Sequence, residues 1–108
     1  MGGNMKSIAA AIFASMILTA AGHAETIITT QWDDITFTQQ ECLTRAEKAI
    51  HEGDFKNLPH TETTRHGTRG QYTAAVRCLG DKKIVFFVVA GPEAHLTERY
   101  LDGIRDHF

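Results

Sequence analysis

The sequence predicts an α+β fold, a two-layer sandwich in which two helices cover one face of an antiparallel sheet. The first observation is a continuous run of apolar residues from Ile84 to Ala90, which is typical of a buried strand. The second is a pair of segments, residues 39–52 and residues 92–108, whose apolar residues recur every three or four positions as in amphipathic helices. The expected order is strand, helix, three antiparallel strands and helix.

The N-terminal end, residues 1–24, has the pattern of a secretory signal peptide. Lys6 precedes an apolar stretch over residues 8–21, and small residues follow up to Ala24. This stretch is shorter than the roughly 20 residues that a membrane-spanning helix needs. We therefore expect cleavage after Ala24, a periplasmic or secreted product with no membrane contact, and a single compact domain at residues 25–108.

The composition argues against several classes of function. Loss of Lys6 with the leader would change the formal charge from -2 to about -3, and a mildly acidic chain gives no reason to expect nucleic acid as a partner. No serine follows the leader, which excludes a serine hydrolase. Asp33 and Asp34 are adjacent, so on a strand their carboxylates point to opposite faces and cannot share a substrate. We predict no catalytic residue and no cofactor.

Both expected helices carry recognisable end signals. Thr38 stands three residues before Glu41, which is the spacing of a capping box. The first helix is therefore expected over residues 39–52, and Gly53 is expected to end it in a left-handed conformation. The second helix is expected to run from Pro92, which suits a first helical position, to the C-terminus.

The strands are expected on either side of the first helix. One lies near residues 35–37, with residues 27–30 extended as well, because β-branched and aromatic residues gather there. An exposed edge strand is expected over residues 60–65, followed by a glycine-containing turn. Residues 71–79 alternate between two faces, and a tight turn leads from them into the apolar strand of residues 84–90.

The two cysteines predict which face of the sheet the helices cover. Cys42 and Cys78 are an even pair in an exported domain, which favours a disulfide over two thiols that bind a metal. Cys42 lies in the apolar stripe of the first helix, so the strand residues that share the face of Cys78 should lie under the helices. These residues are Tyr72, Ala74, Val76, Val85, Phe87 and Val89.

The opposite face of the sheet, here called the open face, is then too apolar to be left in water. It should carry Ala75, Arg77, Ile84, Phe86 and Val88. A contiguous apolar patch of this kind marks an interface or a ligand surface. Three covers stay open: residues 25–32 folded across the face, a second copy of the chain in a homodimer, and a foreign protein or apolar ligand.

Two further sites follow from local residue patterns. Arg65, His66 and Arg69 lie near two glycines in an expected turn, where guanidinium groups and backbone amides could hold an anion. The alternative is a basic hairpin tip with no ligand. His60 and His66 have the same parity on the expected edge strand and could hold a metal together, the alternative being ordinary edge-strand polarity.

The segments ECLTRAEKAI, GQYTAAVRCLG and KIVFFVVAGPE resemble small exported bacterial proteins that are known mainly as domains of unknown function. The resemblance covers most of residues 25–108 and lies in a helix-to-strand cysteine pair and a strand that ends in Gly-Pro before the last helix. It implies a compact periplasmic α+β domain and supplies no catalytic residue. The expected function is a non-enzymatic binding or interaction domain that uses the open face. A metal-capture protein and a small enzyme of unknown class are the alternatives.

Overall fold

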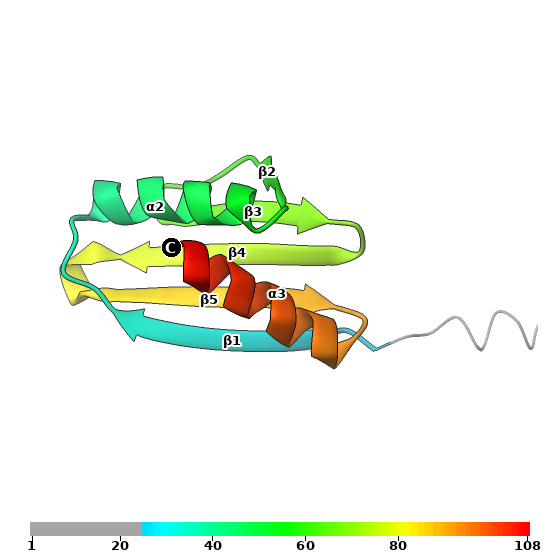
Figure 1. The fold of residues 1–108 in the computed structure, drawn as a ribbon. Coiled ribbons are helices and arrows are strands. Elements are labelled where there is room, and N and C mark those ends of the chain that lie inside the picture. Colours follow the sequence, from blue (N-terminus) through cyan, green and yellow to red (C-terminus); the bar gives the residue numbers. More distant parts are fainter. Residues whose placement is uncertain (1–24) are drawn as a thin grey trace, which may run out of the picture.

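The computed structural model describes residues 25–108, so the predicted leader lies outside the described residues. These residues form five strands and two α-helices (Figure 1). In chain order the elements are β1 (Ile27–Asp34), α2 (Gln39–Glu52), β2 (Lys56–Leu58), β3 (Thr64–Arg69), β4 (Tyr72–Leu79), the short 3-10 helix η1 (Gly80–Lys82), β5 (Ile84–Gly91) and α3 (Ala94–His107).

The sheet is antiparallel throughout, with strand order β1-β5-β4-β3-β2. Both helices lie on the same side of it (Figure 1). Helix α2 packs over β3 and β4, and α3 packs over β5 and β1. The predicted α+β two-layer sandwich is therefore confirmed, and the short strand β2 is an addition to the expected order.

Helix α2 has the predicted bounds. The Thr38 hydroxyl accepts a hydrogen bond from the amide of Glu41 at 3.2 Å, which satisfies one of the free amides of the first turn. At the other end, the expected left-handed glycine is wrong: Gly53 has a φ of -78°, and Asp54 takes the left-handed conformation with a φ of 66°. Glycine at position 53 provides space instead, because a Cβ there would lie 2.9 Å from Cγ1 of Ile104.

Strand β1 includes residues 27–30, which were expected to be extended, and continues to Asp34. It pairs antiparallel with β5 along its whole length, at the edge of the sheet. The expected strand at residues 35–37 is wrong, because Ile35 leaves the sheet, turns into the core and donates from its amide to the carbonyl of Lys83 at 2.9 Å. Of the three covers left open for the open face, the one by residues 25–32 is ruled out, since most of this segment extends the sheet edge and does not cross the face.

The expected edge strand at residues 60–65 is wrong as well. The edge is β2, and β3 lies inside the sheet between β2 and β4. Before β3, the Thr61 hydroxyl accepts hydrogen bonds from the amides of Thr63 and Thr64 at 3.3 and 3.1 Å. Such side-chain bonds hold a turn and compete with the pairing of a strand.

The glycine-containing turn before β4 is shorter than expected. Gly67 lies inside β3, where a Cβ would crowd the side chain of Ile50 and lie 2.9 Å from Cβ of Phe55. Gly70 makes the turn, with a φ of 57° that suits glycine. The absence of a side chain at position 67 therefore lets α2 and the loop after it approach the sheet.

Helix α3 begins two residues later than expected. Its N-cap is Glu93, so Pro92 precedes the helix and does not open it. The residues that α3 buries are Thr97, Leu101 and Ile104, which lie on one stripe at spacings of three and four.

The core lies between the helices and the covered face of the sheet. The six strand residues predicted for that face are buried, together with the apolar stripes of both helices. The predicted disulfide is present: Cys42 of α2 is bonded to Cys78 of β4, their Cα atoms are 6.0 Å apart, and both residues are fully buried. The covalent bond thus lies where α2 packs on the middle of the sheet.

Candidate functional site

The register of the sheet places the side chains of the open face in rows that cross the strands. One row runs from Trp32 on β1 through Phe86 on β5 to Arg77 on β4. Because alternate residues of a strand share a face, the five residues predicted for the open face all lie on it. The next row crosses all five strands and consists of Thr30, Val88, Ala75, His66 and Leu58.

The large apolar side chains that stay exposed gather on this face. In residues 25–108 they are Ile28, Trp32, Leu58 and Phe86, with exposed fractions of 65, 56, 37 and 37%. Trp32 and Phe86 are directly opposite each other in β1 and β5, and such aromatic pairs interact across a sheet. The four residues lie on strands β1, β5 and β2, so the apolar surface reaches both edges of the sheet.

Charged residues lie around the apolar centre of the open face. Arg77 is exposed and stands next to Phe86 across the β4 and β5 pair. Asp34 lies at the end of β1, and Lys56 lies on the far edge strand β2. Aromatic residues and arginine are enriched in protein interfaces, whereas lysine and aspartate are depleted there. The centre, with Trp32, Phe86 and Arg77 in one row, therefore consists of residue types that are enriched in interfaces.

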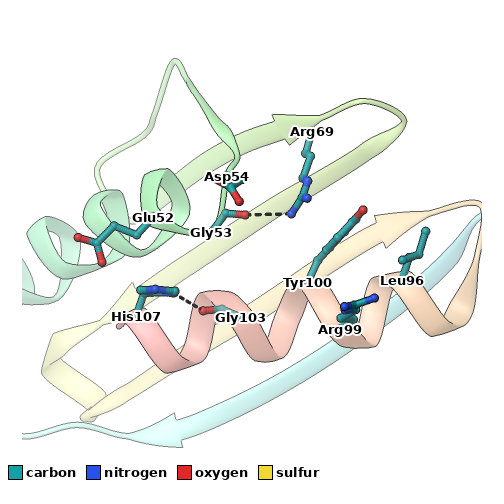
Figure 2. Close-up of a pocket in the computed structure, with 9 residues that line it drawn as sticks. All are labelled: Glu52, Gly53, Asp54, Arg69, Leu96, Arg99, Tyr100, Gly103 and His107. Atoms are coloured by element: carbon teal, nitrogen blue, oxygen red, sulfur yellow. Dashed lines mark hydrogen bonds between the residues drawn. The ribbon is translucent and has the colours of Figure 1, made fainter.

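A separate hollow of about 370 Å³ lies on the other side of the molecule, between the end of α2 and α3. In Figure 2, Tyr100 points from α3 towards Arg69. The guanidinium of Arg69 lies 4.2 Å from the centre of the Tyr100 ring and donates to the carbonyl of Gly53 at 3.3 Å. Because these contacts occupy Arg69, its role here is to close the end of α2 against α3. The residues that line the hollow are Glu52, Gly53, Asp54, Arg69, Leu96, Arg99, Tyr100, Gly103 and His107.

The three residues predicted to hold an anion do not converge. Arg65 and Arg69 lie on the helix side of β3, whereas His66 lies on the open face, because neighbouring strand residues point to opposite sides. The Arg65 guanidinium donates to the carbonyl of Thr61 at 2.9 Å and lies 3.6 Å from the carboxylate of Glu47. Both arginines hold parts of the fold together, so their placement gives the anion site no support.

The two histidines predicted to hold a metal are close to each other. His60 and His66 both line a small hollow, together with Glu47 and Leu58. His60 lies in the loop after β2, not on the same strand as His66 as predicted. Within residues 25–108, no group of three or more His, Cys, Asp or Glu side chains is arranged to hold a metal ion. A protein zinc site has three or four such ligands, so two histidines alone do not complete one.

Comparison of the chain with models of known protein families gives no match, and comparison with curated proteins gives none either. Within the described range, no helix combines the length and the apolar character needed to cross a membrane.

Sequence reasoning missed three of the four exposed apolar residues of the open face, Ile28, Trp32 and Leu58. The sequence did contain a signal for Ile28 and Trp32: in IITTQWDD they alternate with their neighbours, so on a strand they lie on one face together with Thr30. That signal becomes informative only once β1 is known to be a single strand that pairs with β5. Leu58 had no comparable signal, since β2 has only three residues and precedes a proline.

Proposed function

We propose that this protein is a non-enzymatic binding domain, exported to the periplasm or the cell exterior, that recognises a protein through its open face. The observation that carries the proposal is the gathering of Ile28, Trp32, Leu58 and Phe86, all exposed, on one face of the sheet. Removing apolar surface from water is worth about 25 cal/mol for each Å². A partner that covers this face therefore gains free energy that the isolated chain does not.

The position of the hollows favours a protein partner over a small molecule. Small ligands bind in concave sites that bury most of their surface. The hollows found on residues 25–108 lie beside the helices and at the rims of the sheet, and neither Trp32 nor Phe86 lines them. An extended surface with aromatic side chains and an arginine at its centre suits another protein surface.

The disulfide supports the proposed location. Disulfides persist in exported proteins and are rare in reducing compartments, and the Cys42 to Cys78 bond joins the two layers of this small domain. The resemblance to small exported bacterial proteins agrees with this location. If the leader is cleaved as proposed, the mass of the exported chain will correspond to an N-terminus at Glu25 and to the loss of two hydrogens at the cysteines.

A photocrosslinking experiment tests the binding role. The photoreactive residue benzoyl-phenylalanine replaces Phe86 on the open face or Glu98 on the exposed side of α3 in the full chain, expressed with its leader. Irradiation of living cells should give a discrete adduct from position 86 and none from position 98. Equal labelling from both positions, or none from either, would contradict the proposal. The intact mass of each variant serves as its folding control, because formation of the disulfide lowers the mass by two hydrogens.

A further inference from the structure

We infer that the partner on the open face is a second copy of this chain, and that the two copies are related by a two-fold axis running along β5. This inference rests on the proposed function, because it names the occupant of the same face. It follows from the register of the strands, from the place of Arg77, and from the size of the face.

The stripe that β5 contributes is suited to pack on itself. β5 lies between β1 and β4, and its open-face residues are all apolar. A two-fold interface is self-complementary, and residues on the axis meet their own copies. An axis along β5 would place this apolar stripe on the same stripe of the partner. The stripe consists of Ile84, Phe86, Val88 and Ala90.

The same axis brings Arg77 onto an aromatic ring. Trp32 and Arg77 flank Phe86 in one row, one strand to either side of β5. Rotation about β5 exchanges these two positions, so Arg77 of each copy faces the partner's Trp32. A guanidinium over the face of an indole is a favourable cation-π contact, and symmetry makes this contact twice. The charge nearest the centre of the face thus gains a partner without leaving the interface.

The other face-to-face axis, which crosses the strands at right angles through the middle of the sheet, is less suitable. By the register, it would place Arg77 against the partner's Ala75, whereas the axis along β5 places Arg77 on the partner's Trp32. Asp34 does not distinguish the two axes, because it faces an apolar residue of the partner in both, Ile28 for the axis across the strands and Leu79 for the axis along β5. Burying a charged group against apolar side chains costs free energy that no new contact offsets. The register therefore favours the axis along β5.

The face is large enough for a stable dimer. With strands about 4.8 Å apart and a rise of about 3.4 Å per residue, the three strands that this axis brings face to face, β1, β5 and β4, have a projected area of roughly 400 Å². The accessible area of a face covered with side chains exceeds its projection. It is therefore comparable with the roughly 600 Å² per partner at the lower end of specific interfaces.

Sedimentation equilibrium of the exported chain over a wide concentration range tests the dimer. The wild type should associate to twice its monomer mass, and Phe86→Asp or Trp32→Ala should raise the dissociation constant by at least about 30-fold. Arg77→Ala should weaken the dimer by about 10-fold, and Arg77→Lys should recover only part of that loss, because lysine lacks the planar group that stacks. A wild-type chain that remains monomeric at every concentration would overturn the inference.

Thiol crosslinking tests the axis. Facing sheets are about 10 Å apart, too far for a direct disulfide, so a short bismaleimide joins single engineered cysteines. Ala90→Cys lies on the axis and should link to its own copy. Thr73→Cys, its neighbour on β4, should not, because the two copies of Thr73 would be roughly 14 Å apart. A chain carrying Thr73→Cys should instead link to one carrying Ile28→Cys. A dimer in which position 73 links to itself and position 90 does not would refute the axis.

The experiments can refute the binding role and the dimer independently of each other. If photocrosslinking at position 86 captures only a different protein and the purified chain stays monomeric, the second copy is refuted and the binding role stands. If position 86 gives no adduct and the chain is monomeric, both are refuted. A self-adduct of twice the chain mass that disappears in Trp32→Ala supports both.

Discussion

The carboxylate of Asp33 on β1 receives three hydrogen bonds from the guanidinium of Arg105 on α3, at 2.9, 3.1 and 3.2 Å. A second hydrogen bond joins α3 to β1 two turns earlier on the helix, where the hydroxyl of the buried Thr97 is 2.6 Å from that of Thr29. Since Thr97 donates to the carbonyl of Ala94, the hydroxyl of Thr29 is the donor in this bond. These contacts hold one face of β1 under α3, so Trp32, next to Asp33, must point to the open face.

Asp33→Asn is expected to lower the free energy of unfolding by about 1 kcal/mol. The pair has bidentate geometry but is partly exposed, with 32% of the Arg105 side chain and 45% of the Asp33 side chain accessible, so solvent screens it. Urea unfolding of the variants measures the effect. Asp34→Asn, a neighbouring carboxylate on the open face, is the matched control and should change stability by less than about 0.5 kcal/mol. Equal losses in both variants would contradict a stabilising role for the Arg105 pair.

Replacing both Cys42 and Cys78 by alanine is expected to cost about 4 kcal/mol. The bond closes a loop with a sequence separation of 36, and the chain-entropy relation gives this magnitude for such a loop. Guanidinium unfolding, with and without a reductant, measures the loss. A reductant should destabilise the wild type and leave the double variant unchanged. An unfolding midpoint equal to that of the oxidised wild type would show that the bond contributes nothing.

Gly91→Ala and Gly103→Ala are expected to act in opposite directions. A Cβ at position 91 would crowd the ring of Tyr72, and its distance to Cγ of that ring would be 2.9 Å, so overpacking should cost about 1 to 3 kcal/mol. At position 103, in the interior of α3, a Cβ meets nothing within 4 Å, so alanine should stabilise the helix by about 0.5 to 1 kcal/mol. Thermal unfolding of the two variants checks the signs. A stabilised Gly91→Ala would mean that Tyr72 does not lie against this backbone.

Arg69→Ala is expected to cost about 1 to 2 kcal/mol. The substitution removes both the stacking on Tyr100 and the hydrogen bond to the carbonyl of Gly53. Arg99→Ala, which changes another arginine that lines the same hollow, should have an effect below about 0.5 kcal/mol because Arg99 is exposed. Urea unfolding compares the two, and a larger loss for Arg99→Ala would refute the closing role of Arg69.

Phe86→Ala and Phe87→Ala are expected to separate the two faces of β5. Phe87 is only 1% exposed, so its truncation should cost about 3 to 5 kcal/mol of folding stability. Phe86 is 37% exposed, and its truncation should cost about 1 kcal/mol when unfolding is followed at low protein concentration, where association does not contribute. A loss of more than about 3 kcal/mol for Phe86→Ala would place this side chain in the core.

Sequence reasoning succeeded where the determining residues are close together. The bounds of α2 follow from Thr38 and Glu41 at its start, and the pairing of β4 with β5 follows from a short connection. The covered face follows from one parity argument based on Cys78. The predicted residues of the open face lie on it for the same reason, since the alternation of a strand depends only on position.

By itself, the sequence therefore determined the α+β class, the disulfide pair and the two faces of β4 and β5, because periodicity and short connections act locally. Only the tertiary structure decided that β1 pairs with β5, that β2 forms the opposite edge, and that the histidine and arginine side chains of β3 diverge. These outcomes depend on pairing between distant segments, and a mixed polar and β-branched strand such as β1 carries no local signal for its partner. The row of Trp32, Phe86 and Arg77 exists only because β1 pairs with β5, which is distant from it in the sequence.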